Sequence, residues 1–181
     1  MEIAIVKYNA GNIRSVIFAL ERLGIEPILT NDHEVLKTAD KVIFPGVGEA
    51  SNTMKHLKSQ GLDQLIPSLK QPVLGICLGL QLMCKHSEES DTDCLGIFDI
   101  QVKKFVGQEK IPHIGWNSIQ SLKTPLFKHV SEQDYVYYVH SYYAEQSDFA
   151  IATTDYIQPF SAGLHRDNFY AVQFHPEKSG D

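Results

Sequence analysis

Residues 73–79 constrain the fold of this chain more than any other segment. Their sequence, Val-Leu-Gly-Ile-Cys-Leu-Gly, is an apolar run with Gly75 and Gly79 on either side of a single cysteine, Cys77. Such a run is typical of a buried strand, and the glycines permit the cramped turn by which a strand enters a helix. A strand-to-helix elbow of this kind lifts the side chain at its apex clear of the sheet. The segment therefore predicts a strand, an apex at Cys77 and a helix.

Two roles are open for Cys77. A helix N-terminus favours a thiolate and offers free N–H groups to an oxyanion, so a cysteine at the elbow is a candidate nucleophile. A free cysteine in an apolar stretch is more commonly a small buried hydrophobe. The segment by itself does not decide between the two roles.

A second motif lies far downstream. Residues 169–174 form an apolar run that ends in His175-Pro176-Glu177. A thiol attacks a carbonyl best when an imidazole takes its proton, and a carboxylate orients the imidazole and stabilises its cation. Pro176 fixes the turn so that His175 and Glu177 can point the same way. His175 alone would more often be structural, but the two motifs together predict a Cys-His-Glu site.

The first half of the chain alternates between predicted strands and helices. Strands are expected at residues 3–6, 26–29, 41–44 and 72–76, and helices at 13–23, 33–38, 52–60, 62–69 and after Cys77. This alternation predicts an α/β fold, flavodoxin-like or Rossmann-like, with a mostly parallel sheet and helices on both faces. All 181 residues are expected to form one domain.

The second half reads mainly as strands. They are expected at residues 96–105, 113–120, 135–142, 149–154, 161–165 and 169–174, and residues 87–93 read as an acidic, polar loop. This part predicts an antiparallel extension of the sheet.

Charge and composition narrow the class of function. The net charge of −6 argues against a dedicated nucleic-acid surface, which needs clustered Lys and Arg. No apolar run reaches the roughly 18 residues of a membrane span, and residues 1–6 lack the basic start of a secretory signal. A cytoplasmic enzyme that acts on a small metabolite or with a protein partner is expected.

The cysteines fit reduced thiols. Three cysteines are an odd number without the spacing of a disulfide framework. Cys84, His86 and Cys94 lack the paired short spacings of a structural zinc site. No metal or cofactor is expected.

The order Cys77, His175, Glu177 resembles the class I glutamine amidotransferases, in which a cysteine hydrolyses glutamine and ammonia passes to a partner. The resemblance covers nearly the whole chain and implies that Cys77 is the nucleophile, His175 its base and Glu177 the group that orients His175. Four further segments, at residues 45–48, 112–117, 138–142 and 175–179, look like the glutaminase subunits of imidazole glycerol phosphate synthases.

The resemblance implies a partner as well. In that family a cyclase subunit receives the ammonia through a channel and joins it to a phosphoribosyl imidazole-carboxamide intermediate (PRFAR). The products are imidazole glycerol phosphate and AICAR. The resemblance places Asn12, Trp116, Tyr137 and Lys178 at the partner interface, although Trp116 could also be a core residue.

The oxyanion hole is also implied by resemblance. One donor is the backbone N–H of Leu78, and the other is the N–H of Val47 in the Pro-Gly-Val-Gly loop at residues 45–48. Gly46 and Gly48 lower the conformational cost of a peptide flip, so the conformation of this loop could switch the enzyme on and off. Without the resemblance the loop would be read as a simple turn.

Substrate-binding positions come from the same comparison of motifs. Gly46 and Gly48 in the loop, together with Gln81, Ser141 and Tyr142, match positions that hold glutamine. Taken alone, Gln81 would be read as a helix surface residue and Ser141 as a solvent-facing strand residue.

The sequence departs from the family pattern at both ends. Lys7 stands where the family commonly has an acidic residue, which puts the local contacts of residues 9–12 in doubt. The family normally continues into a closing helix, which is either absent here or not included in the 181 residues; without that helix, apolar sheet surface would need another cover.

Two other functions remain open at this point. A glutaminase of the same class could serve another ammonia acceptor, such as a sugar amidation enzyme. A stand-alone cysteine peptidase or γ-glutamyl hydrolase could use the same elbow and His175 without a partner. A noncatalytic binding module is disfavoured, since Cys77, His175 and Glu177 are all present.

Overall fold

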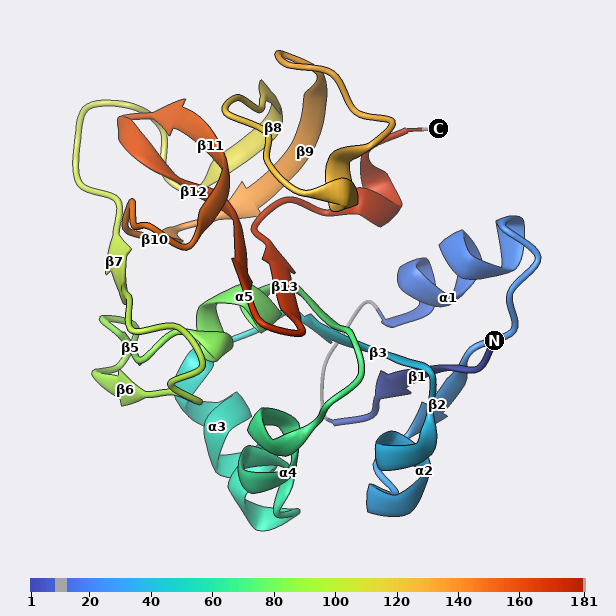
Figure 1. The fold of residues 1–181 in the computed structure, drawn as a ribbon. Coiled ribbons are helices and arrows are strands. Elements are labelled where there is room, and N and C mark those ends of the chain that lie inside the picture. Colours follow the sequence, from blue (N-terminus) through green and yellow to red (C-terminus); the bar gives the residue numbers. More distant parts are fainter. Residues whose placement is uncertain (9–12, 181) are drawn as a thin grey trace.

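A mostly parallel sheet organises the structure, a computed structural model that describes residues 1–8 and 13–180 (Figure 1). Its seven strands lie in the order β11-β12-β13-β4-β3-β1-β2. The strands are β1 (Ile3–Val6), β2 (Ile28–Thr30), β3 (Lys41–Gly46), β4 (Val73–Cys77), β11 (Ala150–Tyr156), β12 (Gln158–Arg166) and β13 (Phe169–Val172). The five strands from β13 to β2 are parallel, and β12 and β11 add an antiparallel edge. The predicted α/β fold with an antiparallel extension is confirmed.

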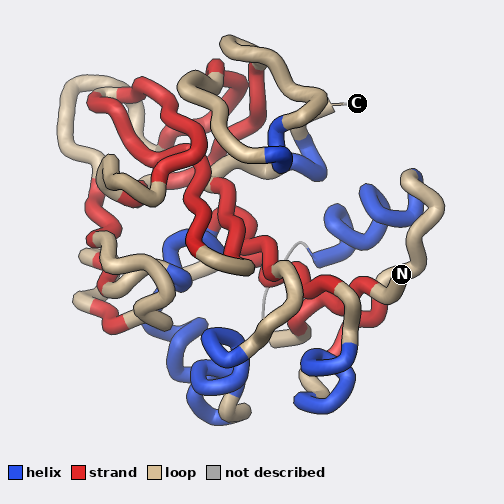
Figure 2. The backbone as a smooth tube through the Cα atoms, in the orientation of Figure 1, coloured by secondary structure: helices blue, strands red, loops and turns tan. Residues whose placement is uncertain are grey.

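Helices cover both faces of the sheet, as Figure 2 shows. They are α1 (Ile13–Arg22), α2 (His33–Thr38), α3 (Ala50–Ser59), α4 (Leu62–Ser68) and α5 (Leu78–Met83). Because side chains alternate along a strand, β1 contributes to two cores. Ile3 and Ile5 pack in one core with Val16 of α1, whereas Ala4 and Val6 belong to the other core.

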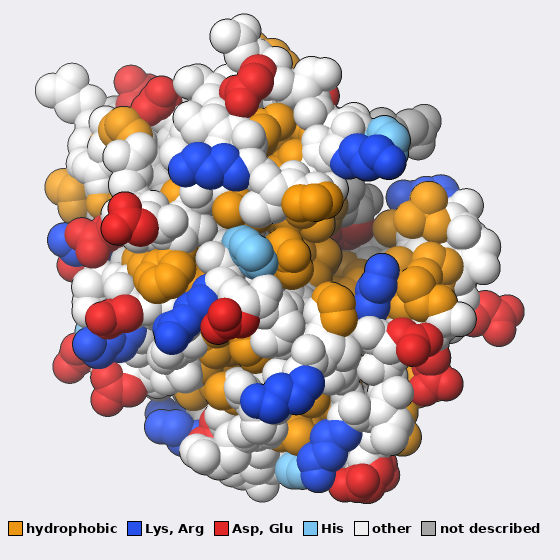
Figure 3. Space-filling model, viewed as in Figure 1, with side chains coloured by type: hydrophobic (Ala, Val, Ile, Leu, Met, Phe, Trp, Pro, Cys, Tyr) orange, Lys and Arg blue, Asp and Glu red, His pale blue; other side chains and the backbone are white. Residues whose placement is uncertain are grey.

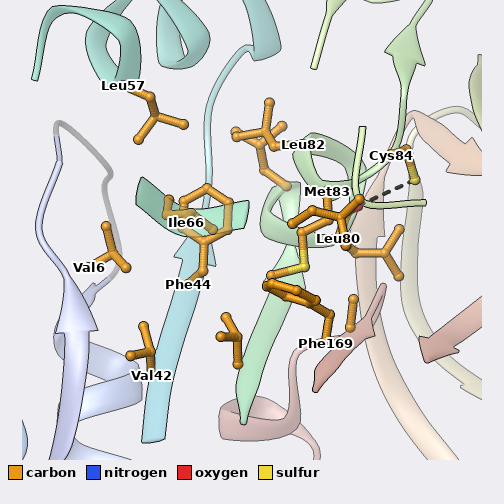
Figure 4. Close-up of a cluster of buried hydrophobic side chains, with 14 of the residues drawn as sticks. Val6, Val42, Phe44, Leu57, Ile66, Leu80, Leu82, Met83, Cys84 and Phe169 are labelled. Atoms are coloured by element: carbon orange, nitrogen blue, oxygen red, sulfur yellow. Dashed lines mark hydrogen bonds between the residues drawn. The ribbon is translucent and has the colours of Figure 1, made fainter. Parts of the chain in front are cut away.

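The larger core lies between the sheet and α2 to α5. Figure 4 shows Phe44 of β3 beside Ile66 of α4, and Leu80 and Met83 of α5 above Phe169 of β13. All five side chains are buried. Since burying a large apolar side chain contributes roughly 1.5–3 kcal/mol, this cluster anchors α5 at the end of β4.

The second half of the chain adds two small sheets. One is four-stranded, with β10 (Tyr142–Ala144), β7 (Gln101–Lys104), β5 (His86–Ser87) and β6 (Thr92–Asp93) in that order. The other pairs β8 (His113–Ser118) with β9 (Tyr135–His140) in antiparallel register. Two short 3₁₀ turns, η1 (Pro125–Phe127) and η2 (Pro176–Lys178), complete the described elements.

Three sequence predictions in this region are wrong in detail. The strand predicted at residues 135–142 is split at Ser141 into β9 and β10, which belong to different sheets. Residues 87–93, predicted as a loop, begin and end in the short strands β5 and β6. The strand predicted at residues 96–105 is confined to β7, because the residues before it bond to the end of α5 instead of a neighbouring strand. The N–H groups of Leu95 and Phe98 donate to the carbonyls of Leu82 and Met83. Helix ends leave carbonyls without partners, and this segment supplies them.

The α1 side of the sheet carries an open apolar groove. It is lined by Ile3, Ile43, Leu74, Leu126 and Tyr170, from β1, β3, β4, η1 and β13. Figure 3 shows hydrophobic side chains gathered around a hollow on this side of the molecule. In the described ranges 1–8 and 13–180, no helix is long and apolar enough to cross a membrane.

The start of α5 approaches β3 too closely for any side chain. A Cβ atom on Gly79 would lie 2.0 Å from the carbonyl oxygen of Phe44. This contact is between backbones, so it cannot be relieved by turning a side chain. The approach sets the distance between the elbow at Cys77 and the end of β3.

Gly79→Ala should destabilise the fold, because the new methyl group forces α5 away from β3. The expected loss is about 3 kcal/mol, which lowers the melting temperature by roughly 10 °C. Thermal unfolding followed by circular dichroism measures the change. Gly163→Ala is the matched control, since its Cβ would meet only side-chain atoms, at 3.3–3.4 Å. Equal melting temperatures for wild type and Gly79→Ala would contradict this account.

Candidate active site

The predicted elbow is present at Cys77. The residue ends β4 with φ 54° and ψ −108°, and α5 begins at the next residue, Leu78. A positive φ is costly for a residue with a Cβ and persists only where the surroundings enforce it. Gly75 and Gly79 let α5 pack tightly on β4 around this elbow, since a Cβ on Gly75 would lie 3.1 Å from the Gly79 backbone. The sulfur at the apex faces a pocket of about 350 Å³.

His175 reaches the same pocket through sheet topology. Strand β13 runs parallel to β4, with Val172 paired to Ile76, so the carboxyl ends of the two strands meet at one edge. Cys77 and His175 both line the pocket. His175 Nδ1 lies 2.8 Å from Glu177 Oε1, and the two side chains are only 2% and 4% exposed. The structure thus brings together the three residues that the sequence singled out.

The charge state of His175 depends on its neighbours. Burial lowers the pKa of His175, but the adjoining Cys77 and Glu177 raise it by more, to about 9. The imidazole is therefore protonated at neutral pH. Its Nε2 atom is buried and has no hydrogen-bond partner among the described residues, so this N–H is available to a ligand in the pocket.

Cys77 has two polar neighbours that the sequence reasoning missed. Its Sγ lies 3.9 Å from the carbonyl oxygen of Val139 in β9 and 3.7 Å from Nε2 of Gln173. Gln173 is fully buried. The available signal in the sequence was a glutamine inside an apolar run, two positions before His175. Such a run is expected to be buried, and a buried amide must have hydrogen-bond partners.

The loop at residues 45–48 lies directly beside the elbow. Gly46 is the register partner of Cys77 between β3 and β4, and Val47 and Gly48 line the pocket. The Tyr8 hydroxyl donates a hydrogen bond to the carbonyl of Pro45. Burial raises the pKa of Tyr8, so the hydroxyl keeps its proton and remains a donor. Tyr8 was not identified from the sequence, where nothing marked it as a contact of this loop.

Of the predicted glutamine-binding residues, all but Gly46 line the pocket. Gln81, Ser141 and Tyr142 are all at its wall. Gln81 is buried, not a helix surface residue, and its Nε2 donates to the Tyr142 carbonyl at 2.9 Å and to Gln173 Oε1 at 3.0 Å. Both amide hydrogens of Gln81 are therefore used within the protein, which leaves its Oε1 for a ligand.

A carboxylate that the sequence reasoning passed over also faces this pocket. Glu89 lies in the segment predicted as a polar loop, and its Oε2 accepts a hydrogen bond from the Ala50 N–H at 2.8 Å. Burial raises the pKa of Glu89, and the nearby charge of Glu49 adds to the effect. A half-buried carboxylate of this kind is suited to bind a cation in the pocket.

Three of the four predicted interface residues form one surface cluster, in which Tyr137 is half-buried, while Asn12 lies outside the described residues. Trp116 is 51% exposed, which excludes a core position. Its ring meets that of Tyr137 edge-on at 5.9 Å, and Lys178 Nζ lies 5.9 Å from the centre of the Tyr137 ring. Tyr137 is also close to the triad, because its carbonyl accepts a hydrogen bond from the His175 N–H at 2.9 Å.

The other two cysteines are poorly suited to nucleophilic chemistry. Burial raises the pKa of Cys84 well above its usual value, and its Sγ donates to the carbonyl of Leu80. Burial and the charge of Asp93 raise the pKa of Cys94 to about 12. Both thiols therefore stay protonated at neutral pH, unlike reactive cysteines.

Comparison with known proteins gives consistent results. Residues 5–181 match the family model for glutamine amidotransferase class I. The chain is 64% identical to the imidazole glycerol phosphate synthase subunit HisH of Bacteroides fragilis strain YCH46, across all of this chain and 94% of that protein. It is 41% identical to the subunit of the same name from Vibrio parahaemolyticus, with 98% and 91% coverage.

Solved structures share the fold at lower identity. A crystal structure of a glutamine amidotransferase superposes with a TM-score of 0.76 at 17% identity, covering 98% of this chain and 91% of the other. A glutamine amidotransferase from Thermotoga maritima gives a TM-score of 0.69 at 17% identity, covering 98% and 76%. These likenesses support the α/β architecture. By its family match and its relatives, the chain belongs to the class I glutamine amidotransferases and, among them, to the family of the imidazole glycerol phosphate synthase subunit HisH.

Proposed function

We propose that the chain is a glutaminase that hydrolyses glutamine through a thioester on Cys77 and passes the ammonia to a cyclase subunit. The observation that carries the proposal is that a strained cysteine elbow and His175, whose ring is held by the buried Glu177, line one pocket. The family to which the chain belongs supports the choice of glutamine as substrate.

The first half of the reaction forms the thioester. Cys77 Sγ attacks the amide carbon of the glutamine side chain, and the carbonyl electrons move to oxygen. His175 gives a proton to the amide nitrogen, the C–N bond breaks, and ammonia leaves. Glu177 holds the imidazole by its Nδ1 and stabilises the cationic form.

The second half regenerates the enzyme. Water attacks the thioester carbon while His175, now neutral, accepts a proton from that water. The C–S bond breaks, glutamate is released and the sulfur returns to its starting state with a protonated His175 beside it. One imidazole therefore serves as acid in the first step and base in the second.

Backbone N–H groups stabilise the negative charge on the oxygen in both steps. We assign one donor to Leu78 at the start of α5 and the other to Val47 in the 45–48 loop, which lies against the elbow. The hydrogen bond from Tyr8 to Pro45 anchors one end of this loop. Gly48, with φ 119°, supplies the freedom at the other end.

The end of glutamine that does not react carries a positive α-ammonium group and a negative α-carboxylate group, and each needs a partner in the pocket. Glu89 is suited to the α-ammonium group, because it is a carboxylate at the pocket wall. Gln81 Oε1 can accept a hydrogen bond from the side-chain amide of glutamine, and Ser141 and Tyr142 supply polar atoms for its α-carboxylate. The glycines at 46 and 48 let the ligand approach the loop backbone closely. A pocket of about 350 Å³ is within the range of small-molecule sites.

The cyclase subunit is assigned to the surface cluster of Trp116, Tyr137 and Lys178, with Asn12 as a further contact. Exposed aromatic side chains are enriched in interface hot spots. The cluster is joined to the triad through the Tyr137 carbonyl. In this account the cyclase converts PRFAR and the transferred ammonia to imidazole glycerol phosphate and AICAR. The three free cysteines are consistent with a cytoplasmic enzyme.

Glutamate release should be slow for the chain alone and faster by roughly 100-fold with the cyclase and its nucleotide ligand. Reorienting the 45–48 loop would add one donor to the oxyanion hole, and one such donor changes the rate by roughly 100-fold. A coupled glutamate dehydrogenase assay measures the rate. Cys77→Ala should abolish it in both mixtures. Equal rates with and without the cyclase would point to another ammonia acceptor or a stand-alone hydrolase, and release by Cys77→Ala would overturn the nucleophile assignment.

Glu177→Gln should shift the pH profile as well as the rate. In the wild type, kcat/KM should fall as His175 loses its proton near pH 9. Removing the Glu177 charge makes the imidazolium less stable, so this alkaline limb should move to lower pH, with a loss of roughly 100-fold or more in kcat. Glu34→Gln, on the exposed surface of α2, removes the same charge and should leave the profile in place. An unchanged alkaline limb in Glu177→Gln would contradict the pairing.

A further inference from the structure

A continuous chain of hydrogen bonds links strand β8 to the nucleophile. Asn117 of β8 lies 3.3 Å from Nε2 of His113, whose Nδ1 lies 3.0 Å from Nε2 of His140 in β9. His140 Nδ1 in turn lies 2.7 Å from the carbonyl oxygen of Tyr142. From that carbonyl the chain continues through Gln81 and then Gln173.

The second half of the chain ends on the sulfur. Gln81 Nε2 lies 2.9 Å from the Tyr142 carbonyl and 3.0 Å from Gln173 Oε1. The last link is the 3.7 Å contact between Gln173 Nε2 and Cys77 Sγ. Because His113, His140, Gln81 and Gln173 are 0–6% exposed, water does not compete for these contacts.

One backbone carbonyl fixes the direction of every link. The Tyr142 oxygen can only accept, so His140 must donate from Nδ1 and Gln81 from Nε2. A neutral imidazole has one donor and one acceptor, so His140 Nε2 accepts from His113 Nδ1. On the other branch, the Gln81 amide nitrogen can only donate, which places the oxygen of Gln173 toward it. The Gln173 nitrogen must then face Cys77.

The two histidines are held neutral and in place. Burial lowers the pKa of His113 to about 4 and that of His140 to about 3, so neither carries charge at neutral pH. The His113 ring is stacked between Tyr156, at 3.9 Å and 12°, and Tyr138, at 4.8 Å and 21°. Stacking on both faces restricts the ring to the plane that its hydrogen bonds require.

We propose that His113 and His140 are positioning residues for the nucleophile, and that they act by fixing the Tyr142 carbonyl and thereby the orientation of the Gln81 and Gln173 amides. The inference rests on the proposed function for its catalytic meaning, since it concerns the same cysteine. Its physical content is that the Tyr142 carbonyl accepts from His140 on one side and from Gln81 on the other, which fixes the Gln81 amide and, through it, turns the Gln173 N–H toward the Cys77 thiolate. An N–H donor to a charged sulfur favours the thiolate over the thiol.

The position of the chain gives it a second consequence. Asn117 and Trp116 are neighbours on β8, and the Trp116 side chain is exposed on the face assigned to the partner. The Asn117 amide is itself fixed, since Nδ2 donates to the Asp155 carbonyl at 3.0 Å and Oδ1 accepts from the Ser118 N–H at 2.8 Å. The strand that carries the exposed tryptophan is therefore hydrogen-bonded, through two histidines, to the nucleophile.

The test measures thiolate formation at Cys77 without glutamine. The rate of alkylation by iodoacetamide is followed over a pH series, and the Cys77 peptide is quantified by mass spectrometry. Cys84 and Cys94 are distinguished by their own peptides. His140→Phe keeps the ring packing against Phe105 and Phe160 but removes both hydrogen bonds. The midpoint of the alkylation profile should move up by about one pH unit, the shift expected for losing about one charge-assisted hydrogen bond.

Three further variants separate hydrogen bonding from packing. His140→Asn keeps a donor for the Tyr142 carbonyl, so its midpoint should lie between wild type and His140→Phe. Phe105→Leu loosens the packing around the histidines without touching a hydrogen bond, so it should lower the melting temperature and leave the midpoint unchanged. Gln173→Glu replaces the final N–H donor and should raise the midpoint even if His140→Phe fails to fold.

The outcomes distinguish this inference from the proposed function. Folded His140→Phe and Gln173→Glu with wild-type midpoints would overturn the positioning role, as would a shift in Phe105→Leu equal to that in His140→Phe. A wild-type chain that releases no glutamate, alone or with the cyclase, but whose variants shift the midpoint as expected would overturn the proposed function and uphold the positioning role.

Discussion

The site depends on the contact between the backbones of β3 and α5. Gly79 lies so close to the Phe44 carbonyl that no side chain fits between them, and this approach holds the elbow at Cys77 in a positive-φ conformation. The same contact places Gly46 beside Cys77 in register. The nucleophile and the loop that we assign to the oxyanion hole are therefore positioned by one constraint, and the buried cluster around Leu80 and Met83 maintains it.

Parallel strand order brings in the rest of the triad. Since β13 pairs with β4, a residue that follows β13 must lie beside the end of β4, however far apart the two are in the sequence. The short turn at Pro176 then places Glu177 against His175. Neighbouring charges raise the pKa of His175 although burial opposes them, so the buried imidazole is held as a cation. Burial of charge is tolerated here because each charge has a partner.

The sequence predicted the elbow and the first parallel strands well, because both depend on residues that are close together in the chain. The elbow follows from glycine spacing, and the first parallel strands follow from apolar runs between helical segments. The buried Tyr8 and Gln173 and the half-buried Glu89 could not be predicted, because each depends on a contact with a residue distant in sequence. The strand expected at residues 96–105 failed for the same reason, since its first half caps α5. The role of Asn12 stays a prediction, because that residue lies outside the described part of the chain.

The central claim is that a γ-glutamyl thioester forms on Cys77, and acid quenching of the enzyme during turnover tests it most directly. Glutamine would be mixed with the chain and its cyclase, the reaction stopped in acid, and the peptides analysed by mass spectrometry. We expect a γ-glutamyl group on the Cys77 peptide and none on the Cys84 and Cys94 peptides. The group should be more abundant in Glu177→Gln if this variant slows hydrolysis of the thioester more than its formation. Steady glutamate release with no adduct on Cys77 in any variant, or with an adduct on another residue, would contradict it.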